Sequence, residues 1–148
     1  MIPYTEEQEA IRRTVRDFTR KEIAPGAAER DETSRFDYSL YKRLCSLGLA
    51  GMVFPAEFGG TDTDTVSFCL ALEEVSRADM SLALTLWVGI QGAQSMTHAG
   101  EEQVAAWRDL YILPTVAGEV LSAGAITEPD AGSDTAALRT RAVLDGDE

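Results

Sequence analysis

The chain has 148 residues, of which 45% are hydrophobic and 26% are charged, a balance that favours a folded globular protein over a disordered one. The 13 basic and 25 acidic residues give a net charge of −12, so neither nucleic acid nor an anionic lipid surface is an expected partner. Cys45, Cys69 and the single histidine, His98, lack the spacing of a metal site, so we expect no metal and a reducing, cytoplasmic compartment.

The first predicted helix runs from residue 6 to about residue 23. Thr5-Glu6-Glu7-Gln8 has the pattern of a capping box, and Pro25-Gly26 is expected to end the helix. The charge-rich residues 28–36 are expected to form a solvated loop. The apolar residues that recur at helical spacing, and should face the core, are Ile11, Val15 and Phe18.

Two more helices are predicted before residue 80. Asp37 is expected to cap the second, which Gly48 ends in a left-handed conformation. The stretch 49–60 reads as a loop or extended crossing, and 62–64 offers caps for a third helix that reaches about Ala78.

The fourth and fifth helices are predicted from their apolar content. Residues 80–98 are apolar almost all round, so this helix should be buried centrally. It is too short and too polar to span a membrane. The fifth helix opens at Glu101 and is expected to end near Leu113, because Pro114 cannot continue it.

The hydrophobic period changes at Val120. Residues 120–126 and 139–144 are predicted as strands, and Asp145-Gly146 is a hairpin turn signal. The predicted fold is therefore mainly α: an up-and-down helical domain over 1–119, followed over 120–148 by the first strands of a truncated β-barrel-like domain.

The most informative stretch is Ala125 to Asp134, which sets two hydroxyls, a proline turn and a glycine after a short apolar run. Gly132 lets backbone approach a ligand closely, while Thr127 and Ser133 offer hydroxyls for hydrogen bonding. This pattern suits a loop that lies against a polar ligand. From composition alone, an ordinary strand-to-loop turn with polar residues at its bend is the favoured explanation.

The run Thr127-Glu128-Pro129-Asp130-Ala131-Gly132-Ser133-Asp134 resembles the signature of the flavin-dependent acyl-CoA dehydrogenase family. The resemblance extends from Tyr4 to Glu148. Three further segments are similar to family patterns: Pro55-Ala56-Glu57-Phe58-Gly59-Gly60, Glu73-Glu74-Val75-Ser76-Arg77, and Ala99-Gly100 followed by Glu101-Glu102-Gln103.

This resemblance implies an acyl-thioester α,β-dehydrogenase that uses FAD. It places Ile126 against the flavin ring, Thr127 at the polar edge of the ring, and Gly132 and Ser133 near the flavin phosphates and the pantetheine arm of the substrate. The family's catalytic carboxylate belongs to a later helical bundle, so no catalytic residue is assigned here. The implied partners are acyl-CoA or an acyl-carrier protein, an electron-transfer flavoprotein or oxygen as acceptor, and further copies in a homo-oligomer.

Two departures from the family pattern stand out. Gly124 replaces a residue that is usually aromatic and that touches the flavin in relatives, so one wall of the site should be thinner. The segment Trp107–Pro114 is longer than the family's by about four residues, close to one helical turn, and should lengthen the fifth helix or bulge its exit.

Trp87 occupies the position where, by resemblance, relatives line the far end of the acyl pocket. An indole there would shorten the pocket and favour a small acyl group. A plain core aromatic on a buried helix explains Trp87 equally well.

Two other functions compete with the dehydrogenase. A monooxygenase-type relative on the same fold would use the same flavin site for oxygen chemistry. A non-catalytic helical interaction module is the expectation if the reading frame ends at Glu148.

Overall fold

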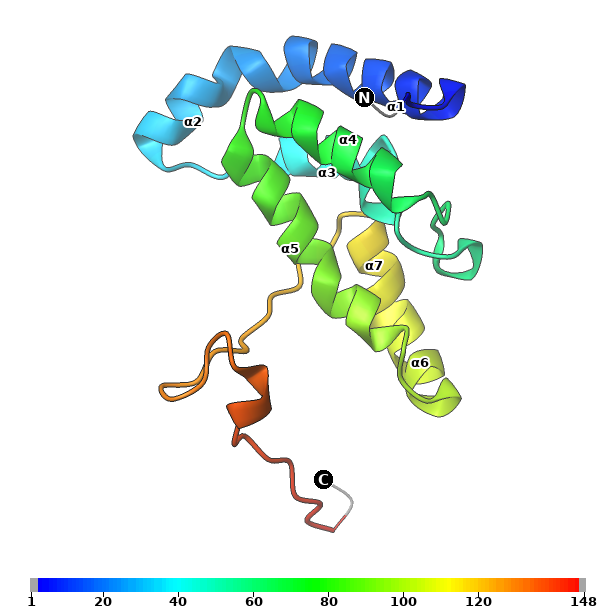
Figure 1. The fold of residues 1–148 in the computed structure, drawn as a ribbon, viewed down its shortest axis with the longest axis vertical. Helices are drawn as coiled ribbons and strands as arrows, with labels where there is room; N and C mark the ends of the chain where they lie inside the picture. The colour runs from blue at the N-terminus through cyan, green and yellow to red at the C-terminus, as the bar shows by residue number, and fades with distance from the viewer. Residues whose placement is uncertain (1–2, 147–148) are drawn as a thin grey trace.

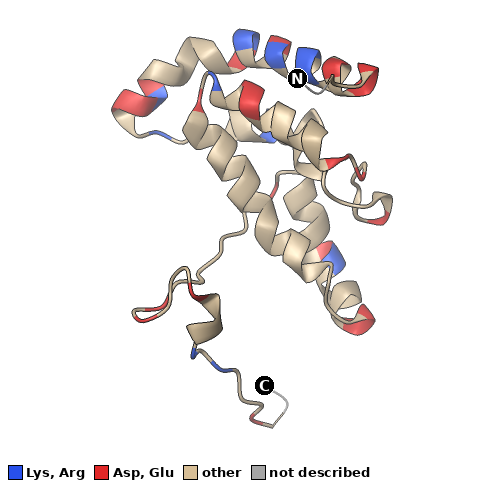
Figure 2. Cartoon of the chain, in the orientation of Figure 1, with Lys and Arg blue, Asp and Glu red and all other residues tan. Residues whose placement is uncertain are grey.

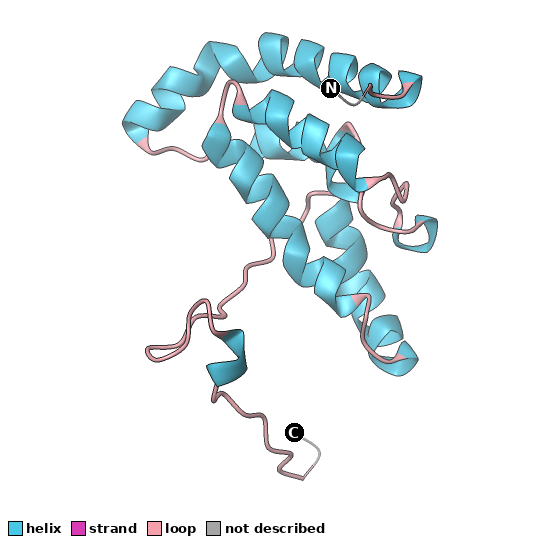
Figure 3. Cartoon of the chain, viewed as in Figure 1, coloured by secondary structure: helices cyan, strands magenta, loops and turns pink. Residues whose placement is uncertain are grey.

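Helices make up most of the structure, a computed structural model that describes residues 3–146 (Figures 1 and 3). The α-helices are α1 Glu6–Phe18, α2 Ala27–Thr33, α3 Tyr38–Ser46, α4 Thr65–Ser76, α5 Met80–Met96, α6 Glu101–Trp107 and α7 Leu113–Val116. Two π-helical segments, η1 Thr19–Ile23 and η5 Arg108–Ile112, and four short 3₁₀ segments, η2 Ala24–Gly26, η3 Leu49–Gly51, η4 Ala56–Phe58 and η6 Thr135–Ala137, connect or follow them.

The N-termini of α1, α3 and α4 lie where the sequence predicts them. The Thr5 hydroxyl accepts from the Gln8 amide and the Gln8 side chain accepts from the Thr5 amide, which is the expected capping box. Asp37 caps α3, and Asp64, one of three predicted cap residues, caps α4. Gly48 ends α3 at φ 93°, a left-handed conformation that favours glycine.

The core lies where α1, α3, α4 and α5 meet. In Figure 1, α1 lies along α4, and α5 runs diagonally away from them beside α7. The large side chains with almost no exposure include Tyr41, Leu44, Phe54, Val75, Leu86, Ile90 and Ile112. Within residues 3–146, no helix is long and apolar enough to cross a membrane.

The loop predicted over 28–36 is wrong, because α2 fills most of it. Pro25 lies at the start of the 3₁₀ segment η2, where its missing amide costs no hydrogen bond, so the chain stays helical into α2. Arg30 then anchors α2 by donating to the Ile23 carbonyl at 2.7 Å and to Asp79 at 2.9 Å. The contact with Asp79 lies far away in the sequence, and α2 has no apolar stripe from which the helix could be predicted.

The predicted end of the fifth helix near Leu113 is also wrong. Pro114 lies in the first turn of α7, and the wide π-helical turn η5 precedes it, so the chain continues helically to Val116. The extra residues expected between Trp107 and Pro114 coincide with this turn.

The fourth helix is only partly buried, contrary to the sequence prediction. One face of α5 is exposed at Met80 (71%), Leu84 (53%) and Trp87 (46%). Side chains of the opposite face, Leu82, Leu86, Ile90 and Ala93, fill the core.

The strands predicted over 120–126 and 139–144 do not form within residues 3–146. These segments have no regular secondary structure: the first crosses α5 at Ser122 before the chain leaves the helices, and a single bridge joins Glu128 to Ala131 (Figure 3). A strand needs a neighbour to satisfy its backbone groups, and the described residues offer none to these segments. The division into domains at residue 120 stays a prediction.

Candidate functional site

The segment Gly118–Ser122 fastens the polar loop to the helices. Gly118, at φ 73°, turns the chain out of α7, and a Cβ atom there would lie 2.7 Å from the Cβ of Cys45. The Tyr38 hydroxyl lies 3.1 Å from the Gly118 carbonyl oxygen and 2.7 Å from that of Glu119. The chain therefore leaves the helical layer along a fixed path.

This segment then crosses α5 at two glycines. Both the amide and the hydroxyl of Ser122 donate to the Gly89 carbonyl, at 3.2 and 2.6 Å. A Cβ at Gly89 would lie 2.8 Å from Leu121, and one at Gly92 would lie 2.8 Å from the Ser122 hydroxyl. Larger residues at either position would push the crossing segment off the helix.

Beyond the crossing, Glu128 holds the polar loop in shape. Its backbone exchanges hydrogen bonds with Ala131, at 2.9 and 3.2 Å, which closes a tight turn over Pro129 and Asp130. Its carboxylate accepts from the hydroxyl and amide of Thr140 and from the amide of Arg139. These donors, the Thr140 hydroxyl first, hold the pKa of Glu128 below its ordinary value.

The site residues predicted in this loop all face outward. Ile126 is 66% exposed, although its side chain is apolar. Thr127 and Ser133 expose their side chains, and a Cβ at Gly124 or Gly132 would meet nothing within 4 Å. The structure therefore brings these residues onto one open segment and leaves room for a ligand beside them.

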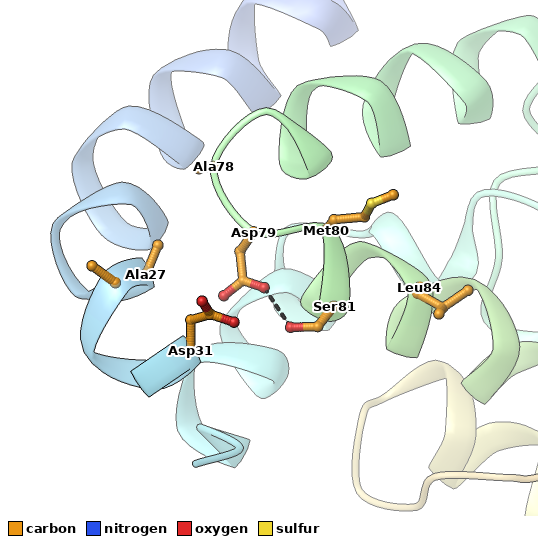
Figure 4. Close-up of a pocket in the computed structure, with 8 residues that line it drawn as sticks. Ala27, Asp31, Ala78, Asp79, Met80, Ser81 and Leu84 are labelled. Atoms are coloured by element: carbon orange, nitrogen blue, oxygen red, sulfur yellow. Dashed lines mark hydrogen bonds between the residues drawn. The ribbon is translucent and has the colours of Figure 1, made fainter. Parts of the chain in front are cut away.

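Trp87, the other predicted site residue, lies on α5 and not in the loop. Its helix neighbours Leu84 and Val88 line a shallow groove of about 310 Å³, which Leu121 and Ser122 close from the other side. A cavity of about 570 Å³ lies next to this groove, between α2 and the start of α5 (Figure 4). Its lining includes Asp31, Ser81 and Leu84. The exposed face of α5 is thus an apolar surface with a groove beside it.

Two carboxylates, one in the helical layer and one in the loop, are held ionised. Glu74 on α4 is 1% exposed, and hydrogen bonds from Arg16, then from Arg12, lower its pKa to about 2. The pKa of Glu128 is lowered by its own hydrogen-bond donors, as described above. Because a general base works best when its pKa lies near the working pH, neither group is suited to abstract a proton.

Sequence reasoning missed the parts that position the loop. The crossing over α5 depends on Ser122, Gly89 and Gly92. The turn in the loop depends on Glu128. The spacing of the two glycines along one helix face was the only available signal for the crossing. For Glu128, the partners lie at 139–140 and no local pattern points to them.

The structure is a helical layer followed by an outward-facing loop that carries the signature residues. Residues 5–118 match the family model described as "Acyl-CoA dehydrogenase, N-terminal domain". The chain belongs to the acyl-CoA dehydrogenase family.

Individual relatives agree with this assignment. The chain is 39% identical to the probable acyl-CoA dehydrogenase YngJ of Bacillus subtilis over 145 residues, which cover 97% of this chain and 37% of that protein. It is similar to the structure of butyryl-CoA dehydrogenase from Megasphaera elsdenii, with a TM-score of 0.79, 32% identity, and coverage of 95% and 37%. A glutaryl-CoA dehydrogenase from Mycobacterium smegmatis in complex with FADH2 gives a TM-score of 0.84 at 28% identity, with coverage of 97% and 36%. The chain therefore spans little more than a third of the length of these relatives.

Proposed function

We propose that this chain is the N-terminal part of a flavin-dependent acyl-thioester dehydrogenase, in which residues 120–148 open a β domain. The main support for this proposal is the loop 126–133. Glu128 and the crossing at Gly89 hold this loop in place, and the residues expected to bind the ligand stay exposed. A loop that is fixed but uncovered is preorganised to bind.

FAD is the proposed cofactor, and open space at Gly124 and Gly132 supports its fit. In this proposal Ile126 packs against the flavin ring, and the Thr127 hydroxyl hydrogen-bonds its polar edge. Gly132 and Ser133 lie near the phosphates and the pantetheine arm of the substrate. Bound flavin supplies the acceptor for the hydride that leaves the substrate's β carbon.

The base that removes the α proton is proposed to lie outside this chain. Glu74 and Glu128 are both poor bases, because hydrogen bonds to their carboxylates lower their pKa values. The role of this chain is to bind and orient, and to hold donors beside the ring.

Trp87 is proposed to shorten the acyl pocket. Its half-exposed indole lies on α5 beside the groove of Leu84 and Val88, so it is available to meet a chain lying there. A short acyl group carried by coenzyme A or by an acyl-carrier protein is the proposed substrate. The proposal includes an electron-transfer flavoprotein or oxygen as acceptor, a homo-oligomer and a cytoplasmic location, where the exposed thiol of Cys69 stays reduced.

The test uses the full-length protein with its flavin absorption as the readout. A short-chain acyl-CoA should bleach the flavin without oxygen. Thr127→Val should weaken FAD binding about tenfold, the effect of one lost hydrogen bond to a polar ring edge. Thr65→Val, an exposed threonine at the start of α4, is the matched control and should leave FAD binding unchanged.

Substrate preference is tested separately. Trp87→Gly should move activity toward longer acyl chains while flavin content stays the same. If no acyl thioester bleaches the flavin, the dehydrogenase proposal is refuted. If Trp87→Gly keeps the same chain-length preference, only the proposed role of Trp87 is refuted.

A further inference from the structure

A second cavity, of about 320 Å³, lies between the π-helical segment η1 and the end of α4. Figure 2 shows several Lys and Arg positions along α1 and η1, at the end of the molecule far from the 126–133 loop. Arg16, Arg20 and Arg77 line the cavity together with Glu74 and Thr19. Its lining therefore carries three positive charges against one negative, in a chain whose net charge is −12.

Glu74 occupies only some of the hydrogen-bond donors of the arginines that line the cavity. It accepts from Arg16 at 2.6 and 3.0 Å, and Arg77 lies 3.5 Å away while also pairing with Glu73 at 3.2 Å. Each guanidinium carries five N–H donors, so Arg16 and Arg77 keep donors beyond these contacts. Within residues 3–146, Arg20 forms no ion pair, and its whole guanidinium is uncommitted.

Thr19 supplies an independent sign of a missing ligand. It is 4% exposed, and its hydroxyl oxygen has no hydrogen-bond partner in the described part of the chain. Leaving a buried hydroxyl unsatisfied is unfavourable, and native structures avoid it unless another group completes the site. Thr19 also begins the wide π-helical turn, a conformation that is frequent at functional sites.

We propose that this cavity binds a phosphate-type anion, either inorganic phosphate or the phosphate group of a small phosphomonoester. Arg16 of α1, Arg20 of η1 and Arg77 at the end of α4 line the cavity, and so does Thr19, whose hydroxyl lacks a partner in the described part of the chain. An anion bound there would meet cationic groups from three elements. A tetrahedral phosphate has oxygens for several donors in different directions. A planar carboxylate would duplicate Glu74, which already takes the bidentate position on Arg16.

The test is calorimetric titration of inorganic phosphate, and separately of glycerol 3-phosphate, into the full-length protein at low ionic strength. Arg20→Gln should weaken binding about tenfold, since it removes a charge-assisted contact without disturbing Glu74. Thr19→Val should weaken binding several-fold without lowering the melting temperature, because valine removes a hydroxyl that is unsatisfied in the free protein. The tighter of the two ligands identifies the source of the phosphate.

Arg13→Gln is the matched control, because Arg13 is an exposed arginine of α1 that lies outside the cavity. It should leave binding unchanged. Two results would overturn the proposal: no saturable binding of either ligand at millimolar concentration, or equal weakening in Arg13→Gln and Arg20→Gln, which indicates diffuse attraction to a basic helix. Both readouts are independent of flavin and of acyl-thioester activity.

Discussion

Replacing Glu74 by glutamine should destabilise the helical layer more than any other single change to a charged residue on α4. Its carboxylate joins α4 to α1 through Arg12 at 2.9 Å and Arg16 at 2.6 Å. Glutamine keeps the shape of the side chain but removes the charge. The arginines are then left close together with no anion between them, which is the unfavourable outcome for a broken buried pair.

The size of the effect follows from the proton affinity of Glu74. Its pKa falls from 4.5 to about 2, which corresponds to about 3 kcal/mol at about 1.4 kcal/mol per tenfold change. The arginine side chains keep 23% and 33% of their exposure, so solvent screening reduces the expected loss to about 2 kcal/mol.

The same reasoning fixes the pH dependence. Because the folded-state pKa is depressed, the stabilisation is fully present above about pH 4.5 and is lost as the pH falls toward 2. Glu74→Gln and the parent chain should therefore differ most at pH 7, and most of this difference should be lost by pH 2.5. Urea unfolding of the 148-residue chain, followed by circular dichroism at both pH values, measures this difference.

The neighbouring Glu73 provides the control. Its carboxylate is 52% exposed and pairs with Arg77 across one helical turn, so Glu73→Gln should cost less than about 0.5 kcal/mol. An equal loss for the two variants at pH 7, or a loss for Glu74→Gln that is as large at pH 2.5 as at pH 7, would refute the electrostatic account of Glu74.

Three further predictions concern backbone and loop. Gly60→Ala should destabilise the chain by about 3 kcal/mol in urea unfolding, because its Cβ would lie 1.9 Å from the Phe54 carbonyl oxygen, whereas Gly124→Ala, in open space, should be nearly neutral. Gly118→Ala should lose about 2 kcal/mol in the same assay through its left-handed φ of 73°; a neutral result would mean that the exit from α7 is not fixed. Glu128→Gln should speed amide exchange at residues 139–140, because the amide group accepts these backbone donors more weakly; unchanged exchange would exclude the carboxylate as their anchor.

Local signals predicted the helix starts well. Thr5, Asp37 and Asp64 cap helices because a short polar side chain reaches amides only three residues ahead, and such a contact is visible in sequence. Family resemblance over the same residues added the fold class, since the matched helices recur in relatives.

Elements that depend on tertiary contacts or on irregular helical turns escaped prediction. Helix α2 depends on Arg30 reaching Ile23 and Asp79, and the continuation through Pro114 depends on the π-helical turn before it. Within the candidate site, the signature loop was recognisable from its own residues. Its support was not, because Glu128 and Ser122 act on residues at least ten positions away, as their bonds to residues 139–140 and to Gly89 show.

The paired hydrogen bonds from Ser122 to the Gly89 carbonyl give the loop and helix α5 a common pivot. Trp87 lies just before this pivot on the helix, and Thr127 lies shortly after it on the loop. With Ser122 seated against Gly92, the pivot has little slack. A displacement of α5 at Gly89 would therefore be passed to Ser122, so the chain that leads into the loop is linked to the helix that carries Trp87.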